Sequence, residues 1–105
     1  MQQENYKVDN CKDYSLIKLP RKVTASDAEF FNSALEIAYE QGHNKIVIDC
    51  SDLRIFNAVG FVYLLVYRKK MSEKNGEIKM INIFDNNLKE RFEMVELNKL
   101  VSIES

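Results

Sequence analysis

Thiol and imidazole side chains are among the groups in this sequence that could bond covalently to a substrate or bind a metal. The chain has two cysteines, Cys11 and Cys50, and one histidine, His43. A thiol becomes reactive when a neighbouring base or metal favours its ionised form. The two cysteines have neither zinc-motif nor Cys-x-x-Cys spacing, and no motif pairs His43 with Cys50. We therefore predict free thiols, with Cys50 buried and structural and His43 solvated at a helix end.

Two carboxylates are the other candidates for chemistry. Asp49 and Asp52 flank the end of a short apolar run, and ligand sites of α/β proteins often lie where parallel strands end. Acid–base catalysis needs more than two acids, because a pocket must also set the pKa of each group for its role. No further member of such a site is evident, so we predict that the chain is not an enzyme and has no metal site and no cofactor.

The composition limits the classes of protein to consider. With 105 residues, 46% of them apolar, the sequence predicts one folded domain over residues 1–105. Its 15 basic and 16 acidic residues lack the basic surplus of a nucleic-acid-binding protein. Residues 1–10 are polar, and the longest apolar run, residues 61–67, is too short to cross a bilayer. We therefore predict a cytoplasmic protein that binds neither nucleic acid nor membrane.

The first part of the chain predicts two strands and a helix. Residues 6–8 and 14–19 have strand patterns, and the short turn between them indicates an antiparallel pair with the first strand at an edge. A helix follows, with Thr24 or Ser26 as its N-cap. Gly42 can adopt the left-handed conformation that ends it.

The middle of the chain predicts a buried strand and a second helix. Residues 45–50 form a β-branched run typical of an inner parallel strand, and residues 51–56 are expected to form a loop. Residues 58–74 predict a helix with Asn57 as its N-cap and a stop at Gly76. This helix is apolar on nearly every side, so it is either largely covered or presents an apolar face to a partner, a second copy of the chain included.

The last part of the chain completes the predicted fold. Residues 77–83 alternate as a strand, Asn86 or Asn87 can cap a third helix, and residues 97–103 form an apolar docking segment or a last strand. The element order is β-β-α-β-α-β-α. It predicts an α/β fold with a mixed, mainly parallel sheet of four to five strands and helices packed against it.

Several segments in this order resemble the STAS family of bacterial anti-sigma factor antagonists. Residues 46–53 (IVIDCSDL) and 56–60 (FNAVG) are similar to the family's apolar strand ending in Asp, which leads through a short loop into a helix beginning Asp-Ser-x-Gly. Residues 77–83 are similar to its glycine-led strand, and residues 92–100 (FEMVELNKL) to its closing helix. The resemblance covers residues 14–103 and implies a STAS-like fold.

The departures from the family pattern concern its regulatory site. Asn57 stands where the family has Asp, and Ala58 stands where it has the phosphoacceptor serine. Gly60 is retained, whereas Glu96 replaces a glycine of the closing motif. Residues 19–21 (LPR) replace the family's Gly-x-Asp step. Because alanine has no hydroxyl, Ala58 cannot be phosphorylated.

The resemblance implies a non-catalytic protein-interaction module. In the family, the unphosphorylated domain binds a partner such as an anti-sigma factor with serine kinase activity, and phosphorylation of the serine ends binding because it adds charge to the interface. At Ala58 that switch is absent, so the implied binding is constitutive or controlled elsewhere. The predicted partner-binding residues are Leu53, Phe56, Asn57, Ala58, Val59, Gly60 and Val62.

Three alternatives remain open at this point. Thr24, Ser26 and Ser51 carry hydroxyls that could be phosphorylated instead, although helix-cap and turn roles explain them as well. Residues 61–67 could serve the core rather than an interface. A small-ligand or nucleotide-sensing STAS domain in a larger signalling assembly is the alternative function, with the ligand at the start of the second helix. The segment 57–60 is no phosphate-binding glycine loop.

Overall fold

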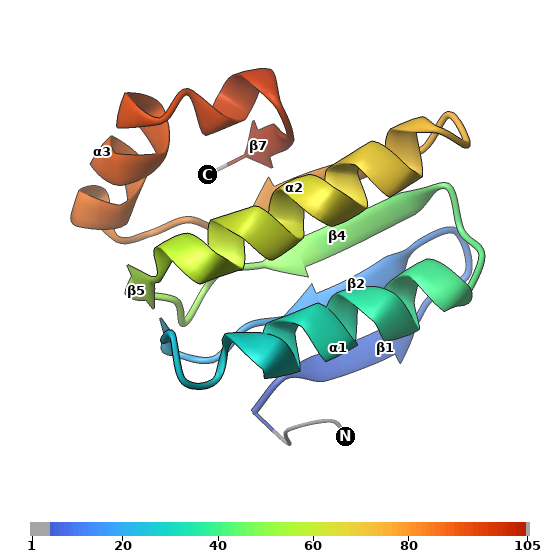
Figure 1. Cartoon of the computed structure of the whole chain (residues 1–105), viewed down its shortest axis with the longest axis horizontal. Helices are drawn as coiled ribbons and strands as arrows, with labels where there is room; N and C mark the ends of the chain where they lie inside the picture. The colour runs from blue at the N-terminus through green and yellow to red at the C-terminus, as the bar shows by residue number, and fades with distance from the viewer. Residues whose placement is uncertain (1–4, 105) are drawn as a thin grey trace.

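A five-stranded sheet forms the centre of the computed structural model, which describes residues 5–104 (Figure 1). The strand order is β1-β2-β4-β6-β7. The antiparallel pair β1–β2 lies at one edge, and all other neighbours in this sheet are parallel. The mixed, mainly parallel α/β fold is therefore confirmed. The strands are β1 (Lys7–Asn10), β2 (Ser15–Lys18), β4 (Lys45–Asp49), β6 (Glu77–Ile81) and β7 (Ser102–Glu104).

Alternation along the strands directs one set of apolar side chains toward the helices. Ile46 and Ile48 of β4 pair in register with Ile78 and Met80 of β6, and all four are buried. Val47 between them is also buried, and its side chain points to the opposite face of the sheet. The four N-terminal positions of the predicted polar segment 1–10, like residue 105, lie outside the described residues.

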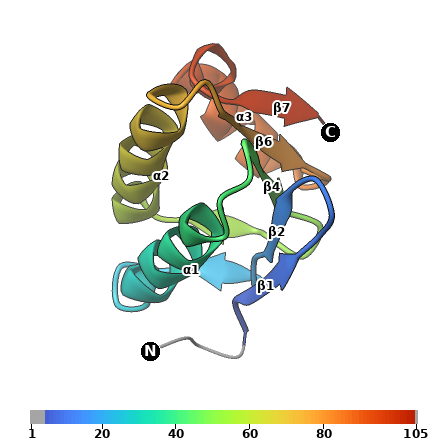
Figure 2. The same ribbon diagram turned by 90° about the vertical axis from the view of Figure 1, so that its right-hand side faces the viewer.

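Two helices cover one face of this sheet. Helix α1 (Ala28–Glu40) follows β2, and helix α2 (Ala58–Ser72) follows β4, and they pack side by side (Figure 2). A third helix, α3 (Asn86–Met94), and the short 3-10 helix η1 (Leu97–Lys99) lead to β7. The closing apolar segment thus contains a strand that pairs with β6. Within the described residues, none of the helices has the length and apolar character needed to cross a membrane.

The expectation of a loop over residues 51–56 is wrong in part. Strand β5 (Ile55–Phe56) pairs in parallel with β3 (Lys22–Val23), forming a separate two-stranded sheet. The Asn57 N–H donates to the Val23 carbonyl at 2.8 Å and extends this ladder to the start of α2. Strands of two residues carry no alternation, so only the long-range pairing reveals them.

The predicted cap of α1 is also wrong. The N-cap is Asp27, and neither Thr24 nor Ser26 fills that position. The Asp27 Oδ1 accepts hydrogen bonds from the Thr24 N–H at 2.7 Å and the Thr24 hydroxyl at 2.8 Å. The carboxylate therefore fixes the preceding turn, and the hydroxyls belong to that turn.

The predicted N-cap of the third helix is wrong as well. Its N-cap is Asp85, not Asn86 or Asn87, and the Asp85 carboxylate accepts from the Leu88 N–H at 3.0 Å. Three polar cap-forming residues stand in a row here, and the sequence alone does not separate them. The Asn57 cap of α2 and the left-handed Gly42 after α1 are confirmed.

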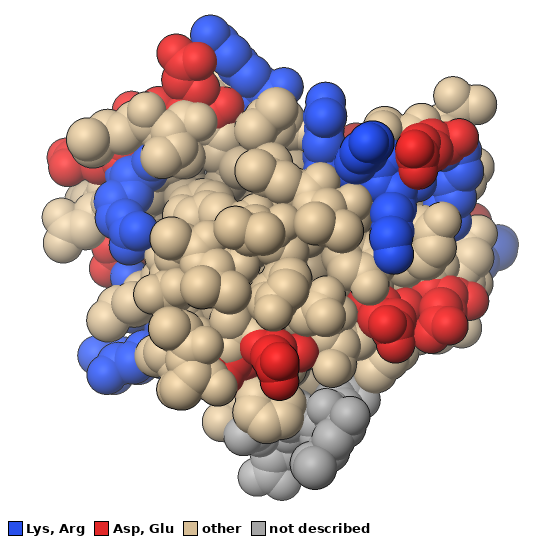
Figure 3. Space-filling model, viewed as in Figure 1, with Lys and Arg blue, Asp and Glu red and all other residues tan. Residues whose placement is uncertain are grey.

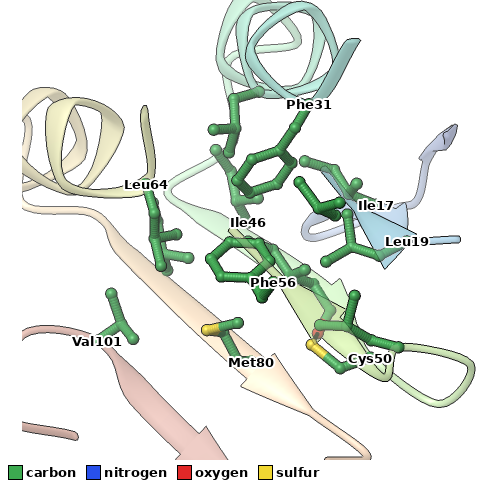
Figure 4. Close-up of a cluster of buried hydrophobic side chains, with 14 of the residues drawn as sticks. Ile17, Leu19, Phe31, Ile46, Cys50, Phe56, Leu64, Met80 and Val101 are labelled. Carbon is green, nitrogen blue, oxygen red and sulfur yellow. Dashed lines mark hydrogen bonds between the residues drawn. The ribbon is translucent and has the colours of Figure 1, made fainter. Parts of the chain in front are cut away.

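The core lies between the sheet and the two long helices. Figure 4 shows Phe31 of α1 and Leu64 of α2 meeting Ile46 and Met80 of the sheet, with Phe56 of β5 among them. Each of these five side chains is fully buried. The core therefore extends to β5 and fixes the segment from which α2 begins.

Candidate functional site

The candidate site is the start of α2, where Asn57 caps the helix. Asn57 has an extended backbone, and its side-chain Oδ1 accepts from the Val59 N–H at 2.8 Å. The Asn57 carbonyl accepts from the Gly60 N–H at 2.9 Å. Two of the N–H groups that a helix start leaves unpaired are thus satisfied internally. Fewer free N–H donors therefore remain for an anionic ligand, and the exposed side chains are the main groups that a partner could contact.

An aromatic cluster holds this helix start in place. The buried Phe56 ring meets the rings of Phe31, Phe61 and Phe92 at centroid distances of 5.6, 4.9 and 6.0 Å, all edge to face. Phe61 also meets Phe92 at 5.6 Å. Edge-to-face pairs add to the free energy of burial. The cluster joins α1, β5, α2 and α3, so the helix start is a rigid part of the domain.

Close packing explains why position 60 is glycine. A Cβ built on Gly60 would lie 2.9 Å from the Phe56 Cζ and 3.1 Å from its Cε1, closer than van der Waals contact allows. The Phe56 ring has little freedom to move because three other rings surround it. Gly60 is therefore required by the aromatic cluster. The backbone of α2 passes directly over the Phe56 ring at this point.

The outer side of α2 exposes a continuous row of apolar side chains. Ala58 is exposed, and the exposed fractions are 38% for Val59, 57% for Val62, 39% for Leu65 and 45% for Val66. These five residues, called the α2 face below, recur at helical spacing. In Figure 3 the middle of the side that carries α1 and α2 is uncharged, and the charged groups lie around it. Contiguous exposed apolar surface of this kind typically marks an interaction site.

A shallow hollow continues the α2 face toward the end of the helix. It has a volume of about 530 Å³ and is open on one side. Its apolar floor comes from Val62, Leu65 and Val66, and its charged rim from Lys69, Lys70 and Glu73. An apolar centre with a polar rim is the arrangement found in protein–protein interfaces.

A family model for the STAS domain matches residues 3–105 of this chain. The chain belongs to the STAS domain family. No curated protein matches the sequence. The STAS assignment therefore depends on the family model and on the fold.

Solved structures with the same fold include bacterial anti-sigma factor antagonists. A Thermotoga maritima protein described as a candidate anti-sigma factor antagonist is 17% identical, with a TM-score of 0.82, covering 95% of this chain and 86% of that one. An antagonist from Mycobacterium paratuberculosis is 14% identical, with a TM-score of 0.78 and coverages of 99% and 90%. The phosphorylated form of the Bacillus cell fate determinant SpoIIAA is 12% identical, with a TM-score of 0.71 and coverages of 95% and 91%. This STAS domain thus shares their fold at low sequence identity.

The structure separates the predicted partner-binding residues into two groups. Leu53 and Phe56 are fully buried, and Gly60 is buried on the inner side of α2, so these three residues support the site from the core. The surface group consists of Asn57, Ala58, Val59 and Val62. Sequence reasoning did not include Leu65 and Val66, although each follows Val62 at helical spacing of three and four residues.

The interpretation of residues 61–67 as core holds for some of them only. Leu64 and Tyr67 are buried, whereas Val62, Leu65 and Val66 are exposed. A helix that is apolar all round has no polar side to mark which residues face solvent. The packing of α2 on the sheet, and not its composition, decides which apolar residues remain outside.

The two carboxylates considered for catalysis, Asp49 and Asp52, have structural partners. The Asp49 Oδ1 accepts from the Ser51 N–H at 3.0 Å and from the Asn82 side-chain amide at 3.2 Å. Asp52 forms an exposed ion pair with Lys18 at 3.7 Å. The Asp49 carboxylate therefore fixes the turn after β4, and Ser51 belongs to that turn.

The thiol and imidazole candidates lie at opposite ends of β4. Cys50 is fully buried and free, and burial, followed by the charge of Asp49, raises the pKa of its thiol. The His43 Nε2 lies 2.6 Å from the Asn10 Oδ1 at the other end of the strand. Among residues 5–104, no three metal-ligating side chains gather into a site.

Proposed function

We propose that this STAS domain is a non-catalytic interaction module that binds a protein partner through the α2 face. The proposed partner is an anti-sigma factor of the serine kinase type, and the proposed role is regulation of transcription in the cytoplasm. The observation that carries the proposal is the exposed apolar row that begins at Ala58, the residue placed where the resemblance puts the phosphoacceptor.

The contact groups differ in what they would contribute. Val59, Val62 and Val66 offer β-branched apolar side chains, which lose little side-chain entropy when a partner orders them. Asn57 would contribute its remaining polar groups at the edge of the contact. Because the aromatic cluster fixes the helix start, binding would require little rearrangement of this domain.

Phosphorylation at position 58 cannot control this binding, because Ala58 has no hydroxyl. The relative SpoIIAA is known in a phosphorylated form. A phosphate brings about two negative charges and three acceptor oxygens, which would oppose apolar contact if placed inside an interface. Ala58 instead places a methyl group at the first turn of α2, so the α2 face remains apolar whatever kinase is present.

The test is a comparison of partner capture by three forms of the domain. The wild type, Ala58→Glu and Ala25→Glu are each used to retain proteins from a lysate of the source cells. Ala25 is an exposed alanine just before α1, so Ala25→Glu makes the same chemical change at the other long helix. We expect an anti-sigma factor of the kinase type on the wild type and Ala25→Glu, and its loss with Ala58→Glu. Equal capture of the same partner by Ala58→Glu would contradict the proposal.

A stability control separates lost binding from lost folding. A glutamate at the first position of a helix interacts favourably with the helix dipole, by about 0.3–1 kcal/mol. We therefore expect Ala58→Glu to unfold at the same urea concentration as the wild type or at a slightly higher one. A folded Ala58→Glu domain that has lost the partner would assign the effect to the α2 face itself.

A further inference from the structure

A groove with an excess of positive charge lies where β2 ends, away from the α2 face. Its volume is about 830 Å³, within the usual range of small-molecule sites, about 300–1,000 Å³. Five cationic and two acidic side chains line it, although the chain as a whole carries a net charge of -1. The cationic residues are Lys7, Lys18, Arg21, Lys22 and Arg54, and the acidic residues are Asp27 and Asp52.

One strand pair sets two lysines side by side in this groove. Lys7 of β1 is the register partner of Lys18 of β2, so both side chains leave the sheet on the same face. Like charges directly opposite on antiparallel strands destabilise the pair. Lys18 pairs with the exposed Asp52 at 3.7 Å, and ion pairs of that kind contribute little.

The small two-stranded sheet brings two arginines together beside these lysines. The Arg54 N–H donates to the Arg21 carbonyl at 2.7 Å, which fixes the two residues next to each other across the β3–β5 pair. The Arg54 guanidinium is oriented by the Leu53 carbonyl at 3.0 Å, and Asp85 approaches it only at 3.9 Å. Within residues 5–104, no carboxylate forms an ion pair with Arg21 or Lys22.

The two carboxylates of the groove do not balance these cations. Asp27 accepts hydrogen bonds from the Thr24 N–H and hydroxyl at 2.7 and 2.8 Å, and its charge offsets one of the five cations. Asp52 has a side chain that is 63% exposed and lies 3.7 Å from the Lys18 ammonium group, so its charge offsets a second cation in part. The fold therefore holds cations from two separate strand pairs around one hollow, which is lined by three more cationic than acidic side chains.

We propose that this basic groove binds a small molecule bearing two or more adjacent phosphate groups. Adjacent phosphates present several oxygens at once, and arginine and lysine bind them through charge-assisted hydrogen bonds. The groove volume fits a small ligand, and its position at the carboxyl ends of β2 and β4 is a common location for ligands in α/β sheets. This inference does not depend on the proposed partner binding, because the groove and the α2 face share no residue.

The test uses inorganic pyrophosphate as the probe, with the intact domain and two charge-reversal variants. Binding is measured by calorimetry, and amide NMR shifts locate it. We expect one saturable site, with shifts in residues 18–24 and 52–55. Arg21→Glu should weaken binding by about tenfold or more, since a hydrogen bond to a charged group is lost.

Lys12→Glu is the matched control, because it makes the same change of net charge in the turn between β1 and β2. Lys12 is exposed and lies at the opposite end of the hairpin from Lys7 and Lys18. We expect its affinity for pyrophosphate to remain within about twofold of the wild type. Equal weakening by both variants would mean that only the overall charge matters, and would overturn the proposal.

Further measurements test the role of the Arg21 charge and the kind of ligand that binds. Arg21→Gln, which removes the charge without adding a new one, should also weaken binding, and its amide spectrum should remain that of the folded domain. Inorganic phosphate should bind more weakly than pyrophosphate, because it spans fewer of the cations. If a poly-glutamate peptide shifts these residues and pyrophosphate does not, the groove is a contact for an acidic protein, and the small-ligand proposal is wrong.

Discussion

The starts of α1 and α2 are built from matching parts but have opposite surfaces. Each helix follows a strand of the main sheet and then a two-residue strand, β3 before α1 and β5 before α2, and these two strands pair. At α1 the polar groups bond to one another around the Asp27 carboxylate. At α2 the Asn57 cap is followed by exposed apolar residues.

The outer sides of the two helices extend this difference. Glu29, Glu36 and Glu40 of α1 are exposed, as expected of a helix with one apolar side and one solvated side. The corresponding side of α2 presents Val62 and Leu65. Folding alone needs only the arrangement seen at α1, so the apolar outer side of α2 is the part of the domain best explained by binding.

The largest expected effect on stability comes from removing the Phe56 ring, which packs beneath the start of α2. Phe56→Ala should lower the free energy of unfolding by about 3–5 kcal/mol, because it leaves a cavity among three rings. Phe84→Ala is the matched control, since Phe84 is 59% exposed, and it should change that free energy by about 0.5 kcal/mol. Urea denaturation measures both. Equal decreases in the free energy of unfolding for the two variants would show that the aromatic cluster does not stabilise the start of α2.

A smaller effect is expected when a methyl group is added over the Phe56 ring. Alanine is the better helix former by about 1 kcal/mol, yet overpacking a core costs about 1–3 kcal/mol. Gly60→Ala should therefore lower the free energy of unfolding by about 1 kcal/mol. In a double-mutant cycle with Phe56→Leu, which shortens the neighbouring side chain, the same alanine should cost less. A gain in stability from Gly60→Ala alone would contradict the packing argument.

The smallest expected effect on stability comes from the outer side of α2. Val62→Lys should change the free energy of unfolding by about 0.5 kcal/mol or less, because the side chain lies outside the core. It should nevertheless end partner capture, whereas Glu36→Lys on the outer side of α1 should not. Sedimentation of the wild type and Val62→Lys also tests whether a second copy of the chain uses this surface. A stable wild-type dimer that Val62→Lys dissociates would assign the α2 face to self-association.

The sequence predicted the elements whose patterns repeat and missed those that depend on long-range pairing. The strand at residues 45–49 and the helix capped by Asn57 have clear local signals and were predicted correctly. Strand β5 was missed because two residues show no period, and its pairing partner lies far away in the sequence. The caps Asp27 and Asp85 were missed because several cap-forming residues stand close together.

For the candidate site, composition identified the segment but not its orientation. Phe56 and Val62 were both predicted to contact a partner on the basis of apolar character. Only the tertiary packing shows that Phe56 lies in the core and Val62 at the surface. The basic groove is also beyond sequence reasoning, because only the fold brings Lys7 and Arg54 beside the cations of residues 18–22, and the chain as a whole is nearly neutral.

The labelling rate of the buried Cys50 thiol can report how often the helices separate from the sheet. Its thiol is sealed beside the end of β4 and its pKa is raised by burial, whereas Cys11 is partly exposed in the turn between β1 and β2. A thiol reagent should therefore label Cys11 in the native state, and label Cys50 only during excursions that separate the helices from the sheet. The labelling rate of Cys50 then reports the free energy of that opening, and a ligand or partner that stabilises the closed domain would slow it without touching the cysteine.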